Sequence, residues 1–70
     1  MEIGGNNMLV SSILKNVKND MEINIYNKST KYITLYDFGT KEYIIHEYGN
    51  CVCTNYDRYE NGIDLFMYID

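Results

Sequence analysis

One histidine and two cysteines are the side chains best suited to chemistry in this 70-residue chain: His46, Cys51 and Cys53. An imidazole and two thiolates would supply three of the four ligands of a structural zinc site. If 49–50 is a two-residue hairpin turn, all three side chains point to one face of that hairpin. The single residue between the cysteines is less than the spacing of zinc knuckles, and there is no further His or Cys. We therefore predict no metal and no cofactor.

Two other interpretations of the same residues exist. Cys51 or Cys53 with His46 could form a nucleophilic dyad. Alternatively, the cysteines are half-buried thiols beside a hydrogen-bonded histidine, which is the interpretation we favour. The chain also contains no phosphate-binding loop, dinucleotide fingerprint or nucleophile elbow. The sequence therefore predicts that the protein is not an enzyme.

Tyrosine is the most informative residue type in the composition. The chain has eight Tyr, two Phe and no Trp. Strand periodicity would place Tyr26, Tyr32 and Tyr36 on one face of a sheet. Such a row can serve only to stabilise a small sheet through cross-strand pairs. It can also recognise a partner, because tyrosine is enriched at interface hot spots.

Charge is concentrated in the second half of the chain. The formal net charge is −4, and residues 42–70 contain six acidic residues, one arginine and no lysine. Binding to a phosphate backbone depends on clustered Lys and Arg, so we predict no direct contact with nucleic acid. An acidic, tyrosine-rich surface instead suits a protein partner with a basic groove.

The hydrophobic pattern predicts a helix followed by strands. Apolar residues over 9–18 recur at helical spacing, with Asn6 or Asn7 as the N-cap. After Asp20 the period changes to two, which predicts strands over 21–26, 32–36, 41–48, 51–56 and 63–69. The predicted fold class is α+β, with one short N-terminal amphipathic helix packed on a 4-5-stranded antiparallel meander sheet.

Three details of this sheet can be tested. Ile25 should lie opposite Ile33, so that Ile33 and Leu35 face the helix. Turns are expected at 49–50 (type II′) and at 61–62 (type I′). The strand over 63–69 is apolar on both faces, which requires either a central position in the sheet or burial in a homodimer.

The domain boundaries follow from the first residues. Residues 1–7 are expected to be a flexible arm, or the product of a mis-assigned start with Met8 as the true first residue, and 8–70 to be a single domain. No apolar run is long enough to span a bilayer, and no signal-peptide pattern is present. With only two cysteines, the chain is predicted to be cytoplasmic and to have no membrane partner.

Small size favours binding over catalysis, because a domain of this length has little room for an enclosed active site. In size and alanine-free composition the chain resembles small phage-encoded anti-defence proteins, including the anti-CRISPR class. That resemblance implies a bacterial host cell, and the acidic, tyrosine-rich surface leads us to expect an inhibitor that occupies the basic groove of a bacterial nucleic-acid-handling protein. The alternatives are a self-associating structural or regulatory module, and a small metal-binding domain built on His46, Cys51 and Cys53. The predicted partner contacts are Tyr56, Asp57, Tyr59, Glu60, Asp64, Glu42 and Glu47.

Overall fold

A computed structural model describes residues 7–69, and they form an α+β domain. The predicted arm over 1–7 lies outside this range apart from residue 7. The elements in chain order are β1 (Met8–Leu9), α1 (Val10–Leu14), β2 (Glu22–Asn27), β3 (Thr34–Gly39), α2 (Lys41–Tyr48), β4 (Val52–Cys53), β5 (Asn55–Tyr59) and β6 (Gly62–Met67).

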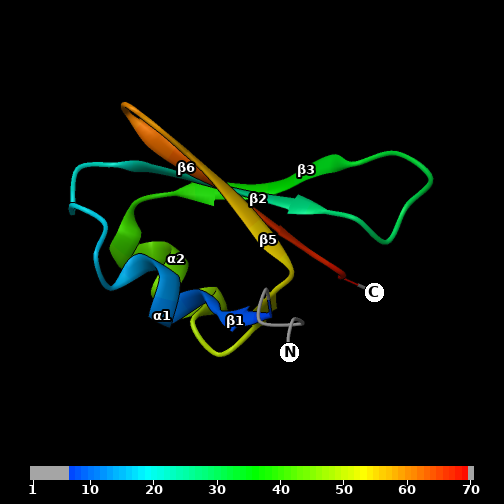
Figure 1. Ribbon diagram of the computed structural model, residues 1–70, viewed down its shortest axis with the longest axis horizontal. Helices are drawn as coiled ribbons and strands as arrows, with labels where there is room; N and C mark the ends of the chain where they lie inside the picture. The colour runs from blue at the N-terminus through cyan, green and yellow to red at the C-terminus, as the bar shows by residue number, and fades with distance from the viewer. Residues whose placement is uncertain (1–6, 70) are drawn as a thin grey trace.

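The main sheet has four strands in the order β3-β2-β6-β5 (Figure 1). The pairs β2–β3 and β5–β6 are antiparallel, whereas β2 and β6 are parallel. The short strands β1 and β4 pair separately. The predicted antiparallel meander is therefore wrong, because β6 lies between β2 and β5 instead of at the end of the sheet. This central position accounts for the apolar pattern on both faces of β6 without a second copy of the chain.

The predicted strand over 41–48 is also wrong, since these residues form α2. Thr40 is the N-cap, and its side chain accepts a hydrogen bond from the backbone N–H of Tyr43 at 3.1 Å. Ile44 is buried, and Ile45 and Tyr48 pack against the core. Residues 44, 45 and 48 share one face of a helix. The helix is part of the connection between β3, which is the antiparallel neighbour of β2, and β6, which is its parallel neighbour.

The two turns also differ from the prediction. Gly49 is the C-cap of α2 with φ of −55°, and no residue from 7 to 69 has a positive φ. The type II′ and type I′ turns require positive φ, so both are excluded at these positions. Between β5 and β6 the turn is formed by Glu60 and Asn61, because Tyr59 already pairs with Gly62.

The β2–β3 pairing has a different register from the one expected. Ile25 lies opposite Asp37 instead of Ile33, and an irregularity follows at the pair Tyr26–Leu35. Ile33 is therefore exposed at the end of the connecting loop, and Leu35 shares the face of Tyr26. The longer loop and the extra residue in β3 place Asp37 toward α2, where two tyrosines bind it.

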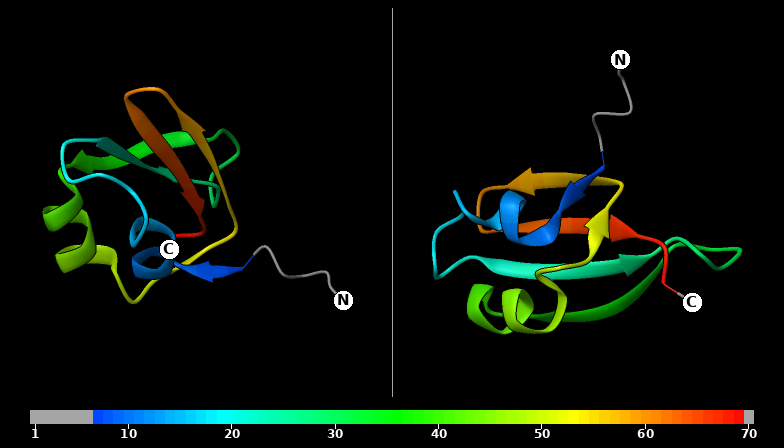
Figure 2. Two further views of the ribbon diagram at one scale, coloured as in Figure 1. Left: turned by 60° about the vertical axis from the view of Figure 1, so that its left-hand side comes forward. Right: turned by 90° about the horizontal axis from the view of Figure 1, so that it is seen from below.

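The helices lie on one face of the main sheet (Figures 1 and 2), and the buried side chains of α1, α2, β2 and β6 form the hydrophobic core. The helix expected over 9–18 extends only over Val10–Leu14, and Leu9 occupies the N-cap position without a side-chain cap hydrogen bond. The buried core residues are Val10, Ile13, Leu14, Val17, Ile23, Ile25, Ile44, Cys53, Ile63, Leu65 and Met67. Both helices cover the same face of the sheet, which leaves the opposite face without a helix in the described range.

Candidate functional site: the uncovered face of the sheet

The uncovered face is built from alternate residues of all four strands, because strand partners point to the same side of a sheet. We call it the outer face. It comprises Glu22, Asn24 and Tyr26 from β2, Leu35 and Phe38 from β3, Asn55, Asp57 and Tyr59 from β5, and Asp64 and Phe66 from β6.

The outer face is apolar toward one end of its two central strands, where Tyr26 and Phe66 lie. The rings of Tyr26 and Phe66 stack at a centroid distance of 5.3 Å across the parallel strands β2 and β6. Leu35 lies beside Tyr26 and is 51% exposed, and Phe38 at the β3 edge is 58% exposed. Large apolar side chains on an uncovered sheet face leave surface in water that a partner could bury.

Carboxylates lie next to these apolar side chains, in the middle of β5 and β6. Asp57 and Asp64 are directly opposite each other on β5 and β6, and Glu60 follows in the turn. Like charges placed opposite one another destabilise a strand pair. Within residues 7–69, none of these carboxylates forms an ion pair, since the one pair of a basic and an acidic side chain in this range joins His46 and Glu47. The outer face therefore presents negative charge that the described chain does not neutralise.

Asp64 is held in place by neighbouring side chains. Its Oδ1 accepts hydrogen bonds from Asn24 Nδ2 and from Tyr59 Oη, both at 3.0 Å. Burial, followed by the hydrogen bond to Asp64, raises the pKa of Tyr59. Gly62 permits the arrangement, because a Cβ at this position would lie 3.1 Å from the Tyr59 ring and 2.5 Å from the Glu22 carbonyl oxygen.

The seven predicted contact residues do not form one surface. Asp57, Tyr59 and Asp64 lie on the outer face, with Glu60 in the adjoining turn. Tyr56 is opposite Leu65 and points to the helix side of β5. Glu42 and Glu47 belong to α2, on the other side of the sheet, where Glu47 pairs with His46 at 3.0 Å.

Several outer-face residues were not identified from the sequence. Of the three tyrosines expected in one row, only Tyr26 lies on this face. Tyr32 is in the β2–β3 loop, and Tyr36 packs edge-to-face against Tyr48 of α2. The contribution of Phe66 was missed, although the two-sided apolar pattern of its strand was a usable signal.

His46, Cys51 and Cys53 do not come together as the hairpin interpretation required. His46 projects from α2 with its side chain 83% exposed, and Cys51 is exposed in the segment after the helix. Cys53 is buried, and its Sγ lies 2.9 Å from the carbonyl oxygen of Asn55. Burial raises the pKa of the Cys53 thiol. In the described part of the chain, no group of three His, Cys, Asp or Glu residues could hold a metal ion.

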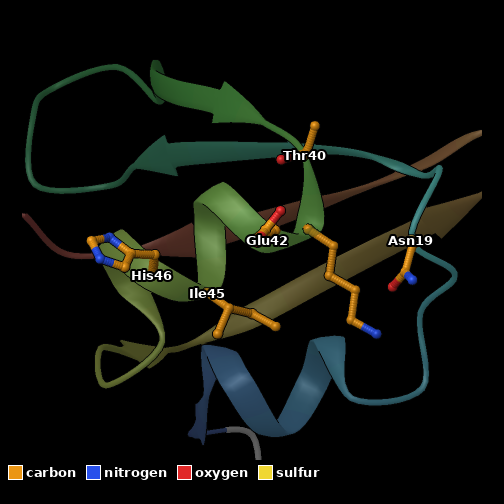
Figure 3. A pocket seen from close by; sticks show the side chains of 6 residues that line it. Asn19, Thr40, Glu42, Ile45 and His46 are labelled. Carbon is orange, nitrogen blue, oxygen red and sulfur yellow. The ribbon is translucent and has the colours of Figure 1, made fainter.

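A cavity of about 740 Å³ lies beside α2 (Figure 3). Its lining residues are Asn19, Thr40, Lys41, Glu42, Ile45 and His46. Figure 3 places His46 and Asn19 at opposite ends of this cavity. Lys41 Nζ donates to the carbonyl oxygen of Val17 at 2.7 Å, and Thr40 caps the helix. The cavity therefore contains no hydrogen-bonded pair of nucleophile and base among residues 7–69.

Asp37 joins β3 to α2 on the helix side of the sheet. Its Oδ2 accepts hydrogen bonds from Tyr48 Oη at 2.5 Å and from Tyr43 Oη at 2.7 Å, and its Oδ1 accepts from the Phe38 backbone N–H. The bond from Tyr48, then those from Tyr43 and Phe38, hold the pKa of Asp37 below its ordinary value. Burial and the bond to Asp37 raise the pKa of Tyr48. These bonds fix α2 against the sheet.

Comparison with protein-family models, curated proteins and solved structures finds no match to this chain. Neither helix in the range 7–69 is long and apolar enough to cross a membrane.

Proposed function

We propose that this chain is a non-enzymatic binding protein that inhibits a nucleic-acid-handling protein by placing its outer face in that protein's basic groove. The observation that supports this proposal is the stacked pair Tyr26–Phe66 beside the carboxylates of Asp57 and Asp64, which no Lys or Arg of residues 7–69 neutralises. From its size and composition, we propose that the chain is a phage anti-defence inhibitor that acts in a bacterial host.

The two parts of the outer face would contribute differently to binding. Aromatic anchors that an interface buries exclude water and slow dissociation. The carboxylates beside them attract a basic partner and speed association, an effect that salt weakens. A groove that holds nucleic acid has the complementary positive charge, so the inhibitor and the nucleic acid would compete for it.

Self-association is the alternative use of an uncovered sheet face. Two outer faces packed together would bring the carboxylates of one copy near those of the other, which disfavours a homodimer through this surface. The central position of β6 also removes the sequence argument for a dimer. A basic partner satisfies the charge of the outer face better than a second copy does.

Affinity capture from a bacterial lysate with matched variants tests the proposal. Asp57→Lys reverses a charge on the outer face, and Glu47→Lys reverses one on α2. We expect the wild type and Glu47→Lys to capture the same nucleic-acid-binding protein, excess duplex nucleic acid to release it, and Asp57→Lys to lose it. The proposal fails if the captured protein does not bind nucleic acid, or if Asp57→Lys retains it unchanged.

A further inference from the structure

A second cavity lies on the helix side of the sheet, where the end of α2 approaches the segments beside β4 and β6. Its volume is about 370 Å³. It is lined by Tyr36, Tyr48, Cys51, Val52, Met67, Tyr68 and Ile69. We call it the tyrosine cavity. None of its lining residues belongs to the outer face.

Among residues 7–69, the lining of the tyrosine cavity includes no charged side chain, although Lys28 Nζ lies 5.7 Å from the centroid of the Tyr68 ring and the Asp37 carboxylate accepts a hydrogen bond from Tyr48 Oη. Three phenol rings and a methionine provide large, polarisable contact surfaces. Met67 is only 2% exposed, so the cavity extends to the hydrophobic core. A charged ligand would lose its hydration here with no oppositely charged side chain among the described lining residues to pair with, which favours a neutral occupant.

Part of the wall is held in a fixed position. Tyr48 is anchored through its Oη to Asp37, and the Tyr36 ring packs edge-to-face against it at a centroid distance of 6.2 Å. By contrast, the rim is exposed: the exposed fraction is 52% for Tyr36, 53% for Val52 and 65% for Tyr68. A ligand would therefore find a preformed aromatic wall and cover apolar surface that is now in water.

We propose that the tyrosine cavity binds a small neutral aromatic molecule of one or two fused rings. The size agrees, because apolar cavities of about 150 Å³ hold benzene and ligand sites begin near about 300 Å³. Flat rings would contact Tyr36 and Tyr48 in the offset or edge-on arrangements that aromatic pairs prefer. This site is independent of the outer face, so its test does not depend on the proposed function.

Titration of the full chain, labelled with ¹³C at its methionine methyl groups, with indole tests this site. We expect a saturable shift of the Met67 methyl signal, with a Kd on the order of 1 mM or tighter. Met21 is the internal control, because it precedes β2 at the end of the sheet far from Met67. Tryptamine carries the same rings with a cation, and we expect it to bind at least tenfold more weakly despite the acidic chain.

Two matched variants locate the binding. Cys51→Trp fills the mouth of the cavity and should weaken indole binding at least tenfold, whereas Asn50→Trp, at the exposed neighbour outside the lining, should not. Tyr68→Ala removes an exposed rim residue without disturbing the core and should weaken binding at least threefold. Equal shifts at Met67 and Met21, no saturation, or unchanged affinity in both Cys51→Trp and Tyr68→Ala would overturn the proposal.

Discussion

Asp57 and Asp64 lie directly opposite each other across β5 and β6, on the face of the sheet that no described helix covers. Asn24 and Tyr59 hold Asp64 in this position, and neither carboxylate pairs with a Lys or Arg of the described chain. Placing two negative charges opposite each other costs stability. Function through a basic partner would explain why such a pair is present.

Asp57→Asn should stabilise the isolated protein. Removing one of two opposed charges is expected to raise the free energy of unfolding by about 0.2–1 kcal/mol. Urea denaturation at low ionic strength measures this change, and added salt should reduce it. Asp57→Asn should also weaken partner binding, so that stability and affinity move in opposite directions. A loss of stability would show that the two carboxylates do not repel each other.

Leu35→Ala should separate binding from folding. Leu35 is 51% exposed on the outer face, so its truncation is expected to change the free energy of unfolding by no more than about 0.5 kcal/mol. If the outer face is the contact surface, the same change should cost about 1–3 kcal/mol of binding. Tyr32→Ala, in the β2–β3 loop, is the control and should change neither quantity. Equal affinities for the two variants would place the contact elsewhere.

Gly62→Ala should destabilise the sheet and misplace Asp64. A Cβ on residue 62 would lie 2.5 Å from the backbone carbonyl oxygen of Glu22, which cannot move without separating β2 from β6. Overpacking of this kind costs about 1–3 kcal/mol. Thermal or urea unfolding measures the loss, with Asn61→Ala in the neighbouring turn as the control. Wild-type stability in Gly62→Ala would mean that the strands at this point are farther apart than described.

The contribution of Asp37 to stability should depend on pH. The hydrogen bonds from Tyr48 and Tyr43 place the folded pKa of Asp37 below its ordinary value of 3.8. Its stabilising contribution is therefore fully present above the unfolded pKa and is lost as pH falls through the folded pKa. The difference in unfolding free energy between the wild type and Asp37→Asn should be constant near pH 7 and shrink below 3.8. A difference that does not change with pH would contradict these bonds.

The sequence predicted the α+β class because its alternating apolar residues are local signals. Ile23 and Ile25 in β2, and Ile63 and Leu65 in β6, are buried as their period of two requires. The segment 41–48 was mispredicted because Ile44 and Ile45 fit a short strand as well as a helix. The N-cap Thr40 and the C-cap Gly49 were the local signals that could have distinguished the two.

The candidate site could be predicted only in part. Asp57, Tyr59 and Asp64 are close in sequence, and the β5–β6 hairpin keeps them close in space. The local acidic and tyrosine-rich composition was therefore enough to predict them. The pairing of Tyr26 with Phe66 depends on parallel strands far apart in sequence, and no local pattern specifies such pairing. Glu42 and Glu47 were predicted to lie on the same surface as Asp57 and Asp64 because the segment 41–48 was predicted to be a strand.

The most direct test of the outer face as an inhibitory surface is NMR titration of the labelled chain with its captured partner. We predict that backbone signals of Asp57, Asp64 and Phe66 shift or broaden while those of α2 do not, and that duplex nucleic acid added in excess restores the free spectrum. Shifts confined to α2, or a complex that nucleic acid leaves intact, would contradict the proposed function.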